Sequence, residues 1–315
     1  MATQSGTIGA GGVAIRGRPT SLWRDAFERL IRNRLAIAGL VFVILLLAVA
    51  IVGPFVTPFP YYDQAIDEVT ANGGLPLAPG QEGHLLGTDQ LGRDLFSRLL
   101  DGARISMTVA FVVQIVILGI GVPVGALAGW LGGRVDQFLM RITDVVYAFP
   151  DLLFVILLSV AFKDTWFGQA VDGLLMVFVA IGVVGWVGMA RLVRGQLLSL
   201  KEQEFVEAAR AIGVNDFKIV TRHLLPNALG PMIVAVTLGI PGAILYEATL
   251  GFLGIGVNVP RASWGTLINT GSDWMRTAPH MVIFPAIAIA VSLLSFTFLG
   301  DGLRDALDPK LKGKQ

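Results

Sequence analysis

The chain has 315 residues, of which 54% are hydrophobic and only 15% are charged, whereas soluble globular proteins carry roughly 25% charged residues. It has 38 glycines, no cysteine and a formal net charge of +1, which excludes disulfides and thiolate sites and leaves no strongly basic surface for a nucleic acid partner. Since glycine is frequent in membrane helices, the composition predicts an all-α protein with several passes through a lipid bilayer.

The N-terminal segment, residues 1–34, precedes the first long apolar run. Residues 1–18 are rich in small and polar residues and are expected to be unstructured. Residues 21–34 place apolar side chains at helical spacing beside four arginines. This pattern predicts an amphipathic helix, which either lies on the membrane surface or forms a solvated lead-in to the first span.

Six apolar segments approach the about 20 residues that a helix needs to cross a bilayer, so six transmembrane helices are predicted. They are 35–56, 105–130, 144–162, 173–190, 229–255 and 280–300. The chain thus divides into the N-terminal segment, the first span with a long loop (35–104), a transmembrane core (105–300) and a tail (301–315). The side that holds both termini has 18 Lys and Arg residues, and the other side has six. Because a Lys and Arg excess marks the cytoplasmic side, both termini and the loop after the fourth span are expected in the cytoplasm.

The long loop 57–104 is therefore expected outside the cell. A helix is predicted to begin near Asp89, to follow the outer membrane surface and to lead into the second span. Asp89, Arg93, Asp94 and Arg98 recur in it at spacings of four, one and four. Such spacing is typical of intrahelical ion pairs, which contribute only about 0.2–0.5 kcal/mol each.

A row of glycines marks the second span and its exit. Gly121, Gly125, Gly129 and Gly133 recur at strict intervals of four and so share one helix face. Small residues at this spacing let another helix backbone approach closely. The row predicts tight packing within the protein, and an interface with another subunit or a moving helix pair are the alternatives.

Glu247 is the clearest ionisable residue inside a predicted span, within ILYEATLGFLGIG. An intramembrane carboxyl group is costly and marks a functional candidate. Two hypotheses remain open at this point. Glu247 lines a translocation pathway, or it forms a structural hydrogen bond to neighbouring groups.

No catalytic or metal site is predicted. The chain has no phosphate-binding loop of the G-x-x-x-x-G-K-[ST] type, no H-E-x-x-H and no G-x-S-x-G. Its three histidines are scattered in the sequence, which leaves no triad and no metal-ligand cluster to propose. The chain is therefore expected to be no enzyme, and the energy for any work that it does must come from elsewhere.

The loop 198–228 is a charged interruption between the fourth and fifth apolar segments. Leu200 to Ile212 is predicted to be one helix, with an apolar face of Phe205, Ala208, Ala209 and Ile212. Gly213 is expected to end it, because glycine accepts the left-handed conformation. Asn215 or Asp216 can cap a second helix, and Pro226 is expected to bend the chain before the next span. Such a helix pair suits a partner protein, although a solvated connecting hairpin is an equal reading of the residues alone.

This loop resembles the signature loop of bacterial ABC importer permeases. The pattern EAA-x3-G-x9-I-x-LP appears here as Glu207-Ala208-Ala209, Gly213 and Leu225-Pro226, with His223 at the usual Ile position. Further motifs are similar to the second permease subunit of dipeptide and oligopeptide importers, over roughly residues 20–312: HLLGTDQLGRDLFSRLLDGARIS, FPDLLF, RHLLPN, SWGTLI and GDGLRDALDPKLK.

The resemblance implies a type I ABC importer permease in the bacterial or archaeal cytoplasmic membrane. It implies a pore formed with a second permease, two cytoplasmic subunits that bind ATP and Mg, and an external solute-binding protein. The expected substrate is a di- or oligopeptide, with nickel, glutathione or another small solute as the alternative within the family. The residues expected to couple to the ATPases are Glu204, Phe205, Glu207, Ala208, Ala209, Gly213, Leu225 and Pro226. A secondary transporter, or a membrane scaffold or enzyme, are the competing classes.

Overall fold

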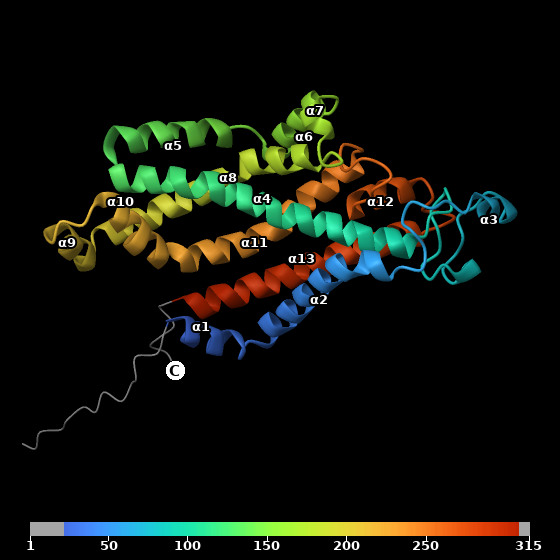
Figure 1. Cartoon of the computed structure of the whole chain (residues 1–315), viewed down its shortest axis with the longest axis horizontal. Coiled ribbons are helices and arrows are strands. Elements are labelled where there is room, and N and C mark those ends of the chain that lie inside the picture. The colour runs from blue at the N-terminus through green and yellow to red at the C-terminus, as the bar shows by residue number, and fades with distance from the viewer. Residues whose placement is uncertain (1–21, 309–315) are drawn as a thin grey trace, which may run out of the picture.

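The computed structural model describes residues 22–308, so the segment expected to be unstructured and the last residues of the tail lie outside the described range. The helices in order are α1 Leu22–Leu30, α2 Arg34–Val56, α3 Ile66–Ala71, a 3-10 turn Gln81–Gly83, α4 Leu95–Leu131, α5 Gly133–Tyr147, α6 Asp151–Phe162, α7 Trp166–Gln169, α8 Leu174–Lys201, α9 Glu204–Ala211, α10 Asp216–Ile219, a π-helical turn Val220–Leu224, α11 Leu225–Phe252, α12 Trp264–Ser272 and α13 His280–Leu307. The long helices run along a common direction, with α9 and α10 at one end and α3 at the other (Figure 1).

Five helices in the described range are long and apolar enough to cross a membrane: α2, α4, α8, α11 together with the short helices before it, and α13. The bent pair of α5 and α6 is a sixth candidate. The predicted all-α class with six candidate spans is thus confirmed. The α2 helix is also the least covered of the five, which suits a helix that faces lipid.

The prediction of one continuous helix over 144–162, the third span, is wrong. The chain breaks between Tyr147 and Asp151, and α5 and α6 meet at an angle of 81°. Pro150 precedes α6 in extended conformation, and a proline disfavours helical conformation in the residue before it. The 12 residues of α6 span only about 18 Å, which is too short for the about 30 Å of a hydrocarbon core.

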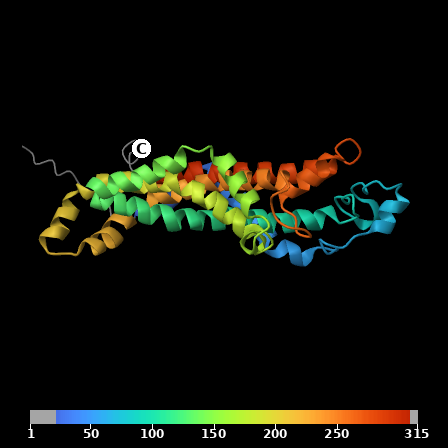
Figure 2. The same cartoon turned by 90° about the horizontal axis from the view of Figure 1, so that it is seen from above.

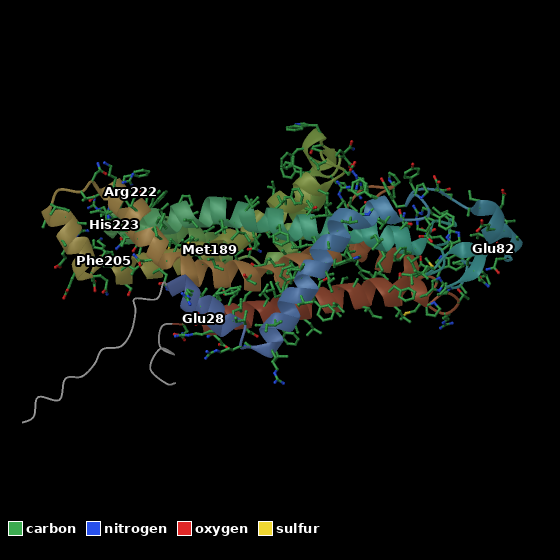
Figure 3. The ribbon with its side chains drawn as sticks, turned by 60° about the horizontal axis from the view of Figure 1, so that its bottom comes forward. Glu28, Glu82, Met189, Phe205, Arg222 and His223 are labelled. Carbon is green, nitrogen blue, oxygen red and sulfur yellow. The ribbon has the colours of Figure 1, made fainter. Side chains whose placement is uncertain are left out.

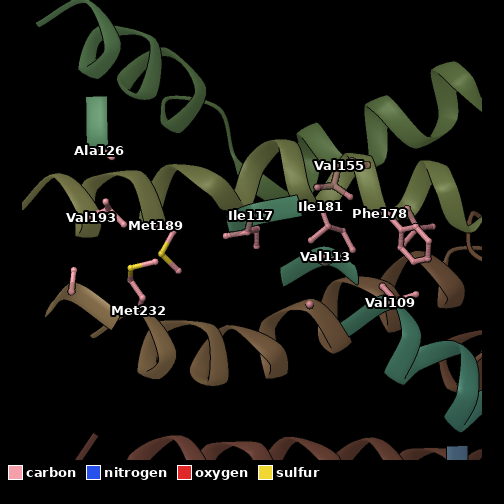
Figure 4. Close-up of a cluster of buried hydrophobic side chains, with 14 of the residues drawn as sticks. Val109, Val113, Ile117, Ala126, Val155, Phe178, Ile181, Met189, Val193 and Met232 are labelled. Carbon is pink, nitrogen blue, oxygen red and sulfur yellow. The ribbon is translucent and has the colours of Figure 1, made fainter. Parts of the chain in front are cut away.

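The interior is formed by two clusters of apolar side chains. The first fills the space between α4, α8 and α11, where Met189 and Met232 point toward one another and Ile181 lies near Val113 (Figure 4). The second joins α2, α4, α12 and α13 around Trp264 and Phe296. The first cluster continues from the middle of the bundle to α9, because Val206 and Ala209 belong to it.

Helices α4 and α8 are in close contact along a row of glycines. A Cβ atom at Gly121 would lie 2.8 Å from the Met189 Cβ, and one at Gly129 would lie 2.9 Å from the Leu197 Cβ. Gly125 faces the Ala190 carbonyl oxygen in the same way. These three glycines therefore let two membrane helices approach within the protomer. Gly133 departs from the predicted row: it is the first residue of α5, has a φ of 53° and faces open space.

The prediction that a helix begins near Asp89 is also wrong. Helix α4 begins at Leu95, and the Asp94 carboxylate caps it by accepting from the Ser97 backbone N–H and hydroxyl, both at 2.7 Å. Residues 89–93 form a turn instead, in which Gly92 has a φ of 74°. Arg93 Nε lies 2.6 Å from Asp89 Oδ2, so this pair forms in a buried turn and not on an exposed helix face.

The same buried cluster joins the loop to the first turn of α4. Arg98 Nε lies 3.4 Å from Asp89 Oδ2, and the His84 Nδ1 lies 2.8 Å from Asp94 Oδ1. All of these side chains are almost fully covered. Buried charges are found in proteins when they are paired and hydrogen-bonded, so the four residues that suggested a surface helix are in fact the polar interior of this loop.

Candidate functional site: the loop between α8 and α11

The loop between α8 and α11 is two short helices that project beyond the end of the bundle (Figures 1 and 2). The single helix predicted from Leu200 to Ile212 is wrong at its start, because α8 ends at Lys201 and α9 begins only at Glu204. Gly213 follows α9 with a φ of 77° and faces open space. Only glycine adopts this conformation without strain, so the sequence pattern located the end of α9 through local backbone chemistry.

The second helix of the loop continues into the membrane without the expected break. Asn215 Oδ1 accepts from the Phe217 backbone N–H at 2.8 Å and so caps α10. A π-helical turn, Val220–Leu224, then joins α10 to α11, and Pro226 lies within the first turn of α11. The helix is therefore not interrupted at Pro226. The wider π turn comes before the proline, which has no backbone N–H to donate.

His223 lies in this π turn, at the same end of the molecule as Phe205 and Arg222 and opposite Glu82 (Figure 3). Its side chain is half-buried, and its backbone carbonyl accepts from the Asn227 side-chain amide at 2.6 Å. The structure thus places His223 in the π-helical turn that joins α10 to α11.

The faces of α9 differ from the predicted ones. Val206 is fully buried and Ala209 is 6% exposed, whereas Phe205 is 39% exposed and Ile212 is 80% exposed. Of the predicted apolar face, only Ala209 is turned inward. Val206 was missed, although its spacing of three from Ala209 was the available signal. The residues that α9 and its neighbours leave on the surface or partly covered are Glu204, Glu207, Ala208, Gly213, Leu225 and Pro226.

Charge on α9 follows the direction of its dipole. Glu204 and Glu207 lie in its first turn and Arg210 in its last turn, where each stabilises the helix. Phe217, at the start of α10, is 75% exposed. The loop therefore combines a polar surface with three exposed apolar side chains, Phe205, Ile212 and Phe217.

Glu247 lies inside the protomer, between α11 and α4. It is 2% exposed, and the Ser106 hydroxyl donates to its Oε2 at 2.8 Å. This placement favours the structural hydrogen bond over a position on a translocation pathway. In the described part of the chain, no group of three His, Asp or Glu side chains could hold a metal ion.

Comparisons with known proteins agree with this geometry. Residues 121–313 match a family described as the binding-protein-dependent transport system inner membrane component, and residues 21–79 match the N-terminal transmembrane domain of oligopeptide transport permease C. The chain is 43% identical to the oligopeptide transport system permease protein OppC of Haemophilus influenzae, over 92% of this chain and 89% of that protein. It is also 43% identical to the dipeptide transport system permease protein DppC of Bacillus subtilis, over 94% and 88%.

Solved structures show a similar fold. Two inward-facing crystal forms of the MetNI methionine ABC transporter contain a chain that superposes with TM-scores of 0.54 and 0.52, at 20% and 23% identity. The match covers 67% and 66% of this chain and 96% and 94% of the other. This chain therefore belongs to the family of binding-protein-dependent transport system inner membrane components, and it is a multi-pass inner-membrane permease subunit of an ABC importer.

Proposed function

We propose that this chain and a second permease together form the pathway through which an ATP-driven importer moves di- or oligopeptides into the cytoplasm. The names of its relatives carry the substrate class: proteins that are 41–44% identical over 92–95% of the chain are named for oligopeptide or dipeptide transport. A relative from Pectobacterium atrosepticum that is named for glutathione transport is 40% identical over 92% of the chain. Glutathione is therefore the competing substrate that an experiment has to exclude.

The loop between α8 and α11 is the part of the chain that receives energy from the ATPases. Each of two cytoplasmic ATPase subunits holds ATP and Mg and accepts one such loop, and an external binding protein delivers the peptide. The three uncovered side chains Phe205, Ile212 and Phe217 support this assignment, because aromatic and large apolar residues are typical anchors of protein interfaces. Their position at the tip of an otherwise charged loop suits a groove on a partner.

Uptake by the whole complex tests the proposal. The permease pair, the ATPases and the binding protein are reconstituted in proteoliposomes, and ATP-dependent accumulation of a labelled tripeptide is measured. Excess unlabelled peptide is expected to compete strongly and glutathione weakly. ATP-dependent uptake of labelled glutathione without uptake of the labelled tripeptide would overturn the peptide assignment.

Gly213→Pro tests the role of the loop. Proline fixes φ near about −65°, whereas Gly213 has a φ of 77° and donates its N–H to the Arg210 carbonyl at 2.9 Å. The variant is expected to lose both transport and substrate-stimulated ATP hydrolysis. Gly254→Pro is the matched control, because Gly254 has a φ of 76°, faces open space and donates to the Gly251 carbonyl at 3.1 Å, outside the α8–α11 loop. Normal transport by Gly213→Pro would contradict the coupling role.

The cytoplasmic orientation of the loop has its own test. The chain has no cysteine, so single cysteines report their side without a background. Lys218→Cys in α10 and Gln81→Cys near α3 are both at exposed positions. A membrane-impermeant maleimide added to intact cells, after the outer membrane has been made permeable where there is one, is expected to label only the cysteine at 81. The reverse labelling would show that the Lys and Arg excess was misread.

A further inference from the structure

Trp130 lies where the ends of three helices meet. It is in the last turn of α4, where the carbonyl groups have no partner within the helix, and its carbonyl accepts from Lys201 Nζ of α8 at 2.8 Å. The Lys201 Nζ is 5.6 Å from the centre of the indole ring, and the Arg210 Cζ of α9 is 4.8 Å from it. Since Trp is the strongest aromatic partner for a cation, this one residue binds the ends of both α8 and α9.

The apolar face of α9 belongs to the same buried cluster as Trp130. Val206 and Ala209 are in one cluster of buried side chains with Trp130 and with Leu197 of α8. Trp130 itself is only 8% exposed, so its ring is removed from solvent on most of its surface. Helix α9 is thus tied to the end of α4 by the Arg210 contact, and its two buried side chains share a cluster with Trp130 and Leu197.

The α4–α8 pair is close-packed and has little room to deform. Gly129, next to Trp130, would bring a Cβ to 2.9 Å from the Leu197 Cβ and to 3.0 Å from the Arg194 carbonyl oxygen. Close-packed interiors transmit displacement because they compress little. A shift of α9 at Trp130 therefore moves α4 and α8 together.

The covalent route from α9 to α11 is softer. It passes through Gly213, which faces open space, and then through the π-helical turn Val220–Leu224. A glycine with open space around it tolerates a change in its backbone dihedral angles easily. Contact through Trp130 is thus stiffer than the covalent route from α9 to α11.

We propose that Trp130 is the positioning residue through which a movement of α9 is passed to the α4–α8 pair. This rests on the proposed function, in which α9 receives its movement from an ATPase. Trp130 is covered and does not contact the ATPase itself. Without the Trp130 side chain, ATP hydrolysis is expected to continue while transport falls. A loop that no longer binds the ATPase is expected to lose both activities.

The test compares Trp130→Ala, Trp130→Phe and Arg210→Gln in the reconstituted complex. The number of peptides transported per ATP hydrolysed is expected to fall about tenfold in Trp130→Ala, the factor that corresponds to losing about 1.4 kcal/mol from the contact. Trp130→Phe keeps an aromatic face and is expected to restore most of the ratio. Arg210→Gln is expected to lower the ratio in the same direction, and the double variant is expected to be no worse than Trp130→Ala alone.

Arg191→Gln is the matched control, because the Arg191 Cζ lies 4.6 Å from the Tyr147 ring in a similar contact away from α9. It is expected to leave the ratio unchanged. In all variants the ATPases are expected to co-purify with the permease. A normal ratio in Arg210→Gln, additive effects in the double variant, or loss of the ATPases from Trp130→Ala would each overturn the proposal. If the proposed function fails instead, Gly213→Pro keeps its transport and its ATP hydrolysis.

Discussion

The contact between α4 and α8 can be tested by adding one methyl group. In Gly125→Ala the new Cβ would lie 2.9 Å from the Val193 Cβ and would also press on the Ala190 carbonyl oxygen. Carbon atoms in good contact are about 3.5–4.0 Å apart, so the helices have to separate by about 0.6 Å or more at this point. Overpacking of this kind costs about 1–3 kcal/mol.

Gly119→Ala provides the comparison, because Gly119 lies in the same helix and faces open space. Both substitutions gain the same about 0.5–1 kcal/mol of helix propensity, so the difference between them isolates the steric cost. Thermal unfolding of the purified complex in detergent measures it. Gly125→Ala is expected to unfold at a lower temperature than Gly119→Ala. Equal midpoints would refute the conclusion that these helices have no room for a methyl group.

Two further predictions concern buried polar pairs, and both use the same unfolding measurement. Ser106→Ala removes the donor 2.8 Å from Glu247 Oε2 and is expected to cost about 1–3 kcal/mol, because a buried polar atom loses its partner; no change would mean that this hydrogen bond is not formed. Arg261→Gln removes the cation 3.0 Å from the buried Asp101 carboxylate and is expected to cost about 1–3 kcal/mol. Arg24→Gln, whose exposed pair is near the N-terminus, is expected to change stability by less than about 1 kcal/mol, and equal effects of the two arginines would contradict the role of burial.

The sequence by itself determined the features that depend on local chemistry. Long apolar runs need a membrane, and the distribution of Lys and Arg predicts an orientation for it. Close helix packing at Gly121, Gly125 and Gly129 could be predicted because small residues four apart share a helix face. The end of α9 at Gly213 was readable because a positive φ favours glycine.

Only the tertiary structure decided which face of each element is covered. The spacing in α9 is compatible with either Phe205 or Val206 inside, and burial in the large apolar cluster selects Val206. The spacing from Asp89 to Arg98 suits a helix, but it also suits a turn whose charges pair in the interior. The local sequence pattern is the same for a helix and for a turn, so the free energy of burial decides which of the two forms.

The contacts that hold the helices together join residues that are distant in the chain. Trp130 and Lys201 are separated by 71 positions, and Ser106 and Glu247 by 141. No spacing rule within one helix relates such residues, because periodicity describes a single element and not its neighbours. The sequence therefore determined that this chain is a permease, with a loop that we propose couples it to the ATPases, and only the tertiary structure showed that Arg210 of this loop contacts Trp130 of α4.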